Sequence, residues 1–477
     1  VRILSLLRFK GTLLEHRIGR DAARGECGTL SLAMSLETEQ LSVEDRLREL
    51  FTRLNLQRVH VGSGHALDAV TVARTFADRI ASIAVVSPSR LPSEPFRAFD
   101  TRVLFISGDR GPNATMLPSL LEDLPHARGM RLHDYADAAW SDTVADRREE
   151  VEATLLEFFD AMTTQEHVPA LHLESAVGEV AGITYDVRGS GPPLVLLPLS
   201  LARSQWDPII DTLAKRYTTI LLGGAFLGFV PTLEARMRGG YQSVVRQVVD
   251  ACRLAPGESI VEVGCGSGAI ARWLARYVQG ANPITAVDVN AYLLREAEAL
   301  TRSAGLEKAI AYSIGDAEAL PLPSASFDVT LSSTVMEEVN ADRMLAELVR
   351  ITKPGGRIGV VVRAIDMVPW MNVDLPPEVR NAAGRVAGAG ADEDGCADAS
   401  LYRRFVAAGL RDLVMGPQYG ADTGQRSPDR LRLFVGRVAQ GLSADDARQF
   451  RDSVKRATTA GSMVWAEPYH CAVGTRP

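Results

Sequence analysis

Hydrophobic and polar positions along the chain alternate between two patterns. Short apolar runs bounded by glycine, proline or polar residues, such as Ala81–Val86 and Ser259–Val263, have the composition of buried strands. Segments with apolar residues three or four positions apart, such as Leu41–Leu54 and Glu149–Met162, have the spacing of helices with one buried face. Because strand-like and helix-like segments alternate throughout, the sequence predicts an α/β fold.

The alternating segments fall into three stretches, and we expect domain boundaries near residues 165 and 235. The first stretch covers residues 1–165, the second covers 166–235 and the third covers 236–477. The third repeats strand and helix in regular order: we expect strands at Ser259–Val263 and Ile284–Val287 and helices at Tyr241–Cys252, Ala269–Tyr277 and Ala291–Ala304. This order predicts a Rossmann-like sheet with helices on both faces.

Composition narrows the class of partner. The chain has 477 residues, 46% of them hydrophobic and 23% charged, so it can form two or three domains with ordinary cores. Its formal net charge of −7, with acids and bases mixed, argues against nucleic acid as the main partner. No apolar run approaches the roughly 20 residues that span a bilayer, so we expect no membrane span.

The five cysteines are widely spaced and include no CxxC pair, which predicts neither a disulfide framework nor a metal site and fits a reducing compartment. The first 20 residues are apolar and basic but lack a continuous apolar core and a cleavage site, so we interpret them as folded protein rather than as an export signal. Together these features predict a cytoplasmic protein.

The most informative segment is an apolar strand that runs into glycines and then directly into a helix. Gly264, Gly266 and Gly268 follow the strand, and a second apolar strand ends at Asp288. Glycines let the backbone approach a ligand without Cβ clashes, and a helix N-terminus offers free N–H groups. A carboxylate at the next strand end can accept hydrogen bonds from a ribose diol. From these residues alone, NAD(P), S-adenosylmethionine (SAM) and a purely structural turn all stay open.

Later motifs favour one of these ligands. EVGCGSG, AVDVN, GDAEALPLPSASFDVTLSSTVMEEV and LAELVRITKPGGRIGVV occur in this order. They resemble the ordered motifs of class I SAM-dependent methyltransferases, and most closely the small-molecule subgroup that includes ubiquinone/menaquinone-biosynthesis methyltransferases. The resemblance covers about residues 241–362. It implies SAM as the cofactor and a small-molecule methyl acceptor.

The resemblance also implies roles for individual residues near the methionine part of SAM. It places Gly264, Gly266 and Gly268 beside the methionine, with Glu262 close to it. Ser332–Ser333, at the end of the fourth strand, are expected near the sulfonium. A structural alternative for Glu262 is a strand-end acid that caps backbone amides.

For the adenosine part, the resemblance implies that Asp288 holds the ribose diol, with Val289 next to it. Asp316 is expected to accept a hydrogen bond from the adenine amino group, and the Ala317 backbone lies beside the ring. A structural alternative for Asp316 is a loop cap. The resemblance requires no metal, and the sequence contains no convincing cluster of metal ligands.

The chain departs from many small-molecule methyltransferases at one position. Where those proteins have Leu-Glu-His-Val, this chain has Met336-Glu337-Glu338-Val339. Glu338 is therefore the candidate catalytic base or pocket charge, and the plainer alternative is an acid at a helix start. We expect an apolar or aromatic acceptor, with its wall in residues 364–373, because that segment contains Met367 and Trp370. A helix that covers the domain core explains the same residues equally well.

The N-terminal half resembles α/β-hydrolases without their catalytic residues. VHVGSGHALDAVTVARTFADRIASIAVVSP is similar to the nucleophile-elbow region, but Gly64 occupies the serine position and Ser63 comes one residue early. Asp109 lies close to the expected acid position and His133 comes several residues before the expected histidine, where the chain has Ala138–Trp140. We therefore predict no hydrolase activity.

Residues 171–224 resemble the early half of the same fold, so a later half precedes an early half along the chain. Either both halves complete one parallel sheet by permutation, which we favour, or two partial units lie side by side. In both cases the region is expected to serve as a scaffold, as a docking surface for the acceptor, or as a surface for a protein partner or homo-oligomer.

The sequence therefore predicts a SAM-dependent methyltransferase (EC 2.1.1) acting on a small, apolar or aromatic acceptor and fused to an inactive hydrolase-like domain. Two alternatives remain at this point. An NAD(P)-dependent oxidoreductase shares the glycine turn, and a non-catalytic binding protein would keep the fold without the chemistry.

Overall fold

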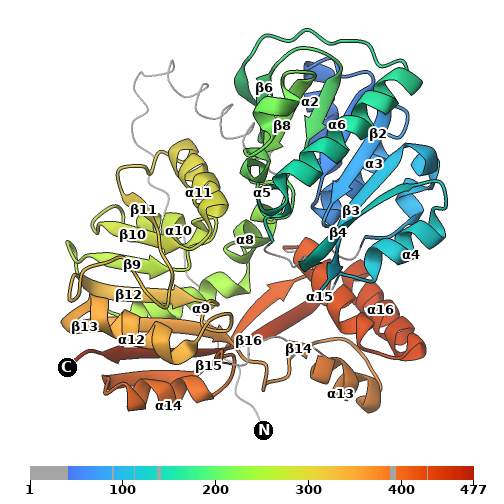
Figure 1. The fold of residues 1–477 in the computed structure, drawn as a ribbon. Coiled ribbons are helices and arrows are strands. Elements are labelled where there is room, and N and C mark those ends of the chain that lie inside the picture. The colour runs from blue at the N-terminus through green and yellow to red at the C-terminus, as the bar shows by residue number, and fades with distance from the viewer. Residues whose placement is uncertain (1–40, 89–90, 112, 137–140, 387–393, 427) are drawn as a thin grey trace, which may run out of the picture.

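The chain folds around two eight-stranded sheets (Figure 1). The computed structural model describes residues 41–88, 91–111, 113–136, 141–386, 394–426 and 428–477. The expectations for the first 20 residues and for Ala138–Trp140 lie outside the described residues. Hydrophobic side chains pack on both faces of each sheet, as expected for an α/β architecture.

The first sheet has the strand order β4-β3-β2-β1-β7-β8-β6-β5. Its strands are β1 Val59–Ser63, β2 Ile80–Val86, β3 Val103–Arg110, β4 Arg128–Ala136, β5 Val177–Val180, β6 Ile183–Arg188, β7 Pro193–Leu196 and β8 Thr218–Gly223. The neighbouring strands from β4 through β3, β2, β1 and β7 to β8 are parallel. At the other edge, β6 is antiparallel to β8 and β5 is antiparallel to β6. The prediction of a parallel sheet is therefore wrong at this edge. A two-residue turn, Ala181-Gly182, joins β5 to β6, and both residues have positive φ, which folds the two strands into a hairpin.

Strands from both N-terminal stretches belong to this one sheet. In its centre β1 pairs with β7, with His60 opposite Leu194, although more than a hundred residues separate them in sequence. The arrangement of one sheet, which we favoured over two partial units, is the observed one.

Helices and helical turns cover the first sheet. They are α2 Val43–Arg53, α3 Ala66–Thr75, η1 Glu94–Arg102, α4 Met116–Asp123, α5 Thr143–Asp146, α6 Arg148–Gln165, η2 Arg203–Trp206 and α7 Ile210–Leu213. The largest buried side chains of this region include Trp206, Phe105 and Phe159. Trp206 also donates a hydrogen bond from its indole nitrogen to the Leu197 carbonyl at 2.7 Å, which fixes the loop after β7.

The second sheet has the strand order β11-β10-β9-β12-β13-β16-β14, and β15 pairs with β16 outside this path. Its strands are β9 Ile260–Val263, β10 Ile284–Asp288, β11 Ile310–Ile314, β12 Phe327–Ser333, β13 Thr352–Arg363, β14 Trp370–Met371, β15 Arg411–Thr423 and β16 Val464–Thr475. Strands β11 to β13 are parallel, whereas β16 is antiparallel to β13, β14 and β15. The order reverses between β9 and β12, which is where α/β sheets bind ligands.

The helices of this half are α9 Gly240–Ala251, α10 Ala269–Tyr277, α11 Ala291–Ser303, α12 Ala341–Ile351, α13 Pro377–Val386, α14 Ser400–Ala407, α15 Pro428–Gln440 and α16 Ala444–Thr459. Helix α16 begins after Ser443, whose hydroxyl accepts a hydrogen bond from the Asp446 amide at 3.2 Å. Helices α13, α15 and α16 form a separate small core with Trp465 and Met371. In Figure 1, α15 and α16 lie below the first sheet.

One short helix, α8 Val230–Arg236, connects the two halves and lies between them in Figure 1. Beside it, Leu201 and Ala202 from the loop after β7 pack with Val230 and with Leu293 of α11. Polar pairs between Tyr292 and Asp142 and between Arg295 and Asp207 flank this apolar contact. Helix α11 of the second half thus packs against loops that connect the strands and helices of the first half.

Candidate functional site

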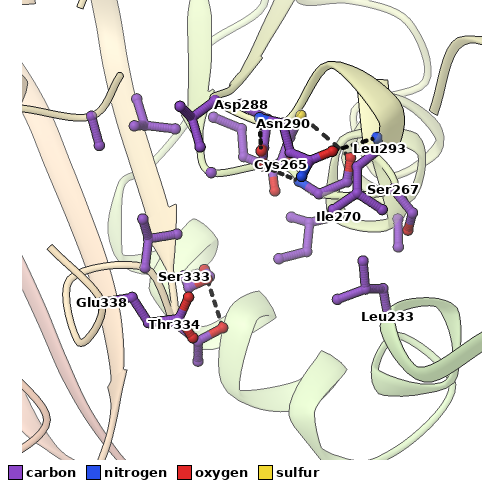
Figure 2. A pocket seen from close by; sticks show the side chains of 18 of the residues that line it. Leu233, Cys265, Ser267, Ile270, Asp288, Asn290, Leu293, Ser333, Thr334 and Glu338 are labelled. Carbon is purple, nitrogen blue, oxygen red and sulfur yellow. Dashed lines mark hydrogen bonds between the residues drawn. The ribbon is translucent and has the colours of Figure 1, made fainter. Parts of the chain in front are cut away.

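A cavity of about 490 Å³ opens at the carboxyl ends of β9, β10 and β12 (Figure 2). Its walls come from the glycine turn after β9, the loops after β10, β11 and β12, and helix α8. Of the predicted cofactor-binding residues, those that line it are Glu262, Gly264, Gly266, Asp288, Val289, Asp316 and Ala317. Residues scattered over more than fifty positions of sequence therefore meet around one space.

The glycine turn has the conformation that only glycine adopts easily. Gly264 and Gly266 have φ values of +80° and +53°. The Gly264 amide donates to the Val287 carbonyl at 2.7 Å, which ties the turn to β10. A Cβ at Gly264 would come within 2.1 Å of the Val335 side chain, so a side chain there would clash with the cavity wall.

Glu262 is the penultimate residue of strand β9, lines the cavity and is 1% exposed. Its Oε2 atom has no hydrogen-bond partner among the described residues. Burial, together with the nearby Asp288 carboxylate, raises the pKa of Glu262 to about 8, and the charge of Arg272 acts in the opposite direction. A buried carboxylate with an unused oxygen is costly, and a cationic ligand would relieve that cost. The cavity therefore suits a ligand with positive charge, such as the sulfonium and ammonium groups of SAM.

Asp288 lies at the end of β10, opposite the glycine turn. One carboxylate oxygen accepts a hydrogen bond from the Gly266 amide at 2.7 Å, and the other accepts from the Asn290 amide at 2.8 Å. Burial raises the pKa of Asp288, and these backbone bonds oppose the increase. Each oxygen keeps lone pairs for a further donor, so the carboxylate is held in place where a diol could reach it. Val289, beside it, is 68% exposed and borders the cavity.

Asp316 and Ala317 border the far end of the cavity, after β11. Asp316 accepts a hydrogen bond from the Glu318 amide at 2.8 Å through Oδ1, so the loop-cap alternative describes one of its oxygens. The same side chain lines the cavity, and capping therefore does not exclude the predicted contact with adenine. Ala317 is 8% exposed and packs with Val263 and Val287.

Two predicted cofactor residues do not border this cavity. Gly268 is the N-cap of α10, and a Cβ there would meet the Tyr312 hydroxyl at 2.3 Å and Ala297, so it faces the helix packing. Ser332 is 1% exposed and donates to the Val263 carbonyl at 2.8 Å, which joins β12 to β9. Strand alternation turns the next residue, Ser333, toward the cavity instead.

Glu338 borders the cavity on the side opposite the glycine turn (Figure 2). Its side chain is 51% exposed, and one carboxylate oxygen lies 3.5 Å from the Arg363 guanidinium. It lies in the loop before α12 rather than at a helix start, so the helix-dipole explanation is wrong. Its position suits a pocket charge or a proton acceptor.

Sequence reasoning missed helix α8, which together with its two capping residues supplies four residues of the cavity wall. Phe229, Leu233, Arg236 and Met237 line the cavity, and a Cβ at Gly266 would touch Leu233 at 3.1 Å. The signal was present in the sequence, because positions 229, 233 and 237 are apolar and four residues apart.

Helix α8 also holds the glycine turn through a carboxylate. Glu234 of α8 accepts hydrogen bonds from the Ser267 hydroxyl at 2.6 Å and from Arg272 at 2.5 Å. Arg272 in turn donates to the Ser267 carbonyl at 2.7 Å. The segment that joins the two sheets is thus bonded directly to the predicted cofactor turn.

The expected acceptor wall in residues 364–373 borders neither this cavity nor its neighbour. Met371 pairs across the sheet with Trp465 and is buried in the small core of α13, α15 and α16. Trp370 is 54% exposed. The alternative of a covering helix is also wrong, since β14 forms there.

At the hydrolase-like turn after β1, the nucleophile position is filled. A Cβ at Gly64 would lie 2.6 Å from the Val86 carbonyl oxygen and 2.9 Å from the Leu199 backbone. Ser63 is fully buried. Asp109 and His133 do approach each other, with 2.9 Å between Oδ2 and Nδ1, but the His133 side chain is 92% exposed. An acid–histidine pair is present, without room for a serine at the position that would complete a triad.

Two structural findings bear on other classes of site. Among the described residues, no group of three or more His, Cys, Asp or Glu side chains is arranged to hold a metal ion. In the same part of the chain, each helix is too short or too polar to cross a membrane.

Comparison with known proteins identifies the region around the glycine turn. Residues 261–360 match the family described as "Methyltransferase domain". Malonyl-[acyl-carrier protein] O-methyltransferase from Erwinia billingiae is 33% identical over 130 residues, which are 26% of this chain and 48% of that protein. Ubiquinone/menaquinone biosynthesis C-methyltransferase UbiE from Legionella pneumophila is 26% identical over 142 residues, or 28% of this chain and 57% of that protein.

A solved structure, geranyl diphosphate C-methyltransferase from Streptomyces coelicolor A3(2), has 15% identity and a TM-score of 0.31, and the match covers 50% of this chain and 79% of that chain. The chain spans about half the length of the curated relatives described above. The family match and the relatives' names support a methyltransferase enzyme of class EC 2.1.1, with S-adenosyl-L-methionine as its cofactor, in this part of the chain.

Proposed function

We propose that the whole chain is a SAM-dependent methyltransferase that acts on a small, apolar or aromatic acceptor, with its N-terminal half as an inactive scaffold. The observation that carries this proposal is the buried Glu262, which lines the cavity and has one carboxylate oxygen without a hydrogen-bond partner among the described residues. A dinucleotide brings pyrophosphate to the glycine turn, and a buried acid there would repel it. A sulfonium compound with an ammonium group instead matches that acid in charge.

The roles of the cavity residues follow from their positions. Glu262 attracts the cationic methionine end of the cofactor, the turn at Gly264 and Gly266 lets the backbone approach it, and Asp288 accepts from the ribose diol. Asp316 accepts a hydrogen bond from the adenine amino group. When bound, SAM supplies a methyl group already activated on a sulfonium. The protein's remaining tasks are to orient the acceptor, to exclude water and, if the acceptor enters protonated, to take a proton, for which Glu338 is the candidate.

The acceptor side of the cavity supports an apolar substrate. The cavity lining includes five apolar side chains: Leu233 of α8, its capping residues Phe229 and Met237, and Val335 and Val339. The relatives are named for a malonyl-[acyl-carrier protein], a quinone-pathway compound and geranyl diphosphate. These are chemically diverse, so the shape of the α8 wall, rather than the matched domain, would select the acceptor.

The N-terminal half is proposed as a hydrolase-like scaffold without hydrolase activity. Backbone atoms of Leu199 and Val86 occupy the space that a nucleophile at position 64 would need. Its loops pack against helix α11, which begins three residues after Asp288 and has Asn290 as its N-cap. A cytoplasmic location and a protein partner or homo-oligomer through this half stay predictions.

Calorimetric titration separates this function from its rivals. The intact chain should bind S-adenosylhomocysteine and SAM and show no heat with NADH or NADPH. Asp288→Ala should lose at least 10-fold in affinity for S-adenosylhomocysteine, because a charge-assisted bond is worth about 1.5–3 kcal/mol. Asp211→Ala, which removes an 88% exposed carboxylate of the first half, is the control and should bind normally. Binding of NADH but not of S-adenosylhomocysteine would establish the oxidoreductase instead, and binding of neither would contradict the proposal.

A further inference from the structure

A second, smaller cavity of about 220 Å³ adjoins the main one. The two share Arg236, Tyr241 and Thr334. The residues that line only the second are Thr232, Arg363, Arg430, Phe434, Glu467 and Tyr469. None of the predicted cofactor residues borders it. The second cavity therefore extends the main one on the side away from the ribose and adenine positions.

Three arginines line the second cavity, and two of them are already neutralised. Arg430 contacts Asp422 at 2.7 Å and Glu467 at 2.6 Å. Arg363 lies 3.4 Å from Glu337 and 3.5 Å from Glu338. The charges of these two guanidinium groups are therefore balanced by carboxylates of the protein itself.

Arg236 differs from the other two. Its guanidinium donates to the Thr334 hydroxyl at 3.2 Å, and among the described residues no carboxylate lies within 4.0 Å of it. It is partly buried at the junction of both cavities. A guanidinium has five N–H donors in a planar fork, and removal from water without an anion is unfavourable.

Two hydroxyl groups stand beside this guanidinium. The Tyr241 hydroxyl lies 3.3 Å from the Thr334 hydroxyl, which receives the Arg236 hydrogen bond. Burial raises the pKa of Tyr241, which keeps its hydroxyl protonated and able to donate. The Thr334 hydroxyl donates its own hydrogen to the Ser333 carbonyl at 2.8 Å, so it holds the guanidinium in place. The donors left for the two oxygens of one carboxylate are the Arg236 guanidinium and the Tyr241 hydroxyl.

We propose that Arg236, held by Thr334 and assisted by the Tyr241 hydroxyl, binds a carboxylate of the methyl acceptor, so that the substrate class is a small molecule with an apolar body and an acidic group. This inference rests on the proposed methyltransferase function. The apolar body would lie against Leu233 and Met237 in the main cavity. A singly charged carboxylate suits the site better than a phosphate, since one uncompensated cation is present and Glu338 and Glu467 stand nearby.

The cofactor also carries a carboxylate, so the experiment must separate the two sources. Arg236→Gln is titrated with S-adenosylhomocysteine and with 5′-methylthioadenosine, which lacks the amino-acid part. The proposal expects both affinities to stay within about twofold of wild type. A loss of at least 10-fold for S-adenosylhomocysteine, with 5′-methylthioadenosine unchanged, would assign Arg236 to the cofactor and overturn the proposal.

The second arm measures the acceptor side with S-adenosylhomocysteine at saturation. The probes are 4-hydroxybenzoate, cinnamate and octanoate, each compared with its methyl ester. Wild type should bind at least one acid 10-fold or more tightly than its ester, Arg236→Gln should remove that preference, and Arg236→Lys should keep part of it. A panel without any preference for acids, or a preference that survives Arg236→Gln, would overturn the proposal.

Arg238→Gln is the matched control, because Arg238 is exposed, lies two residues away and borders neither cavity. It should leave both arms unchanged. Retained binding of S-adenosylhomocysteine in Arg236→Gln shows that the variant is folded. Failure of wild type to bind S-adenosylhomocysteine would instead contradict the methyltransferase function, and so is distinguishable from failure of the carboxylate site.

Discussion

The two sheets contain similar strand–glycine–helix units, which differ in what lies against their glycine turns. After β1, Gly62-Ser63-Gly64 leads into α3, and after β9, Gly264-Cys265-Gly266 leads into α10. The second turn borders about 490 Å³ of space. In the first turn, the backbone of Leu199 approaches within 2.9 Å of a Cβ at Gly64. The difference between the open and the packed turn therefore comes from the loop that follows the neighbouring strand, which is β7 for the first turn and β12 for the second.

The glycines of the two turns serve different purposes. Gly264 and Gly266 have positive φ, as a tight turn that exposes backbone N–H groups requires. Neither Gly62 nor Gly64 has positive φ. In the first turn, glycine is needed because neighbouring atoms lie too close for a side chain. A Cβ at Gly62 would meet the side chains of Leu196 and Trp206, and a Cβ at Gly64 would meet backbone atoms. The strained turn that raises a hydrolase nucleophile is not present.

The largest expected effect is at Gly264. Gly264→Ala should reduce affinity for S-adenosylhomocysteine at least 100-fold, about 2.7 kcal/mol, because its Cβ would clash with Val335 at 2.1 Å and strain the turn. Calorimetric titration measures this loss. Gly257→Ala is the control, with φ of +87° but no atom within 4 Å of the added Cβ. If both variants lose the same affinity for S-adenosylhomocysteine, the cause is backbone strain rather than the clash of the added Cβ with Val335.

The next effect is at Glu262. Glu262→Gln should weaken SAM binding by about 10- to 100-fold, as expected for loss of a charge-assisted contact. Since the pKa of Glu262 is about 8 in the empty protein, affinity of the wild type for SAM should rise with pH up to about 8 as the carboxylate forms. Glu262→Gln should show only the pH dependence of the ligand itself. Identical pH profiles for both proteins would contradict this role.

The same carboxyl group links stability to pH. Its pKa is raised from 4.5 to about 8 on folding, so its contribution to stability is fully present below pH 4.5 and is lost as pH rises toward 8. The melting temperature of the ligand-free wild type should therefore fall more between pH 5 and about pH 9 than that of Glu262→Gln. Differential scanning calorimetry measures both slopes, and parallel slopes would show that Glu262 ionises without cost.

A smaller effect is expected at the closed turn. Gly64→Ser should destabilise the protein by about 1–3 kcal/mol, because the side chain is forced against the Val86 carbonyl and the Leu199 backbone. It should not create hydrolysis of p-nitrophenyl esters, and wild type should show none. Gly416→Ser, at a position with open space, is the stability control. Wild-type hydrolysis that Ser63→Ala abolishes would show that this turn is an active site after all.

The smallest effect is expected at the contact between the halves. Arg295 and Asp207 form an ion pair with side chains 54% and 44% exposed. Arg295→Ala should cost less than about 1 kcal/mol and change S-adenosylhomocysteine affinity less than twofold, because exposed ion pairs contribute little. Chemical unfolding and titration measure these quantities. A loss of affinity above 10-fold would show that the N-terminal half holds α11 in its binding position.

Much of the fold was predictable because local patterns determine it. The strand–turn–helix unit at Ile260–Tyr277 and the helix after Asn290 form where glycine placement and apolar spacing predict them. Strand β4 and helix α8 were missed. Strand β4 is exposed along most of its length, so it lacks the apolar run that identifies a buried strand. Helix α8 has only seven residues, which gives a weak periodic signal.

By itself, the sequence determined which residues could form a cofactor turn, because glycine conformation and the order of the acids at strand ends are local properties. Only the tertiary structure decided which turn is open, since Leu199 and Val335, which close or border the two turns, come from distant parts of the chain. It also brought Arg236 from the joining helix to the junction of two cavities. Apolar periodicity shows which face of an element is buried, but it does not show which distant segment packs against that face.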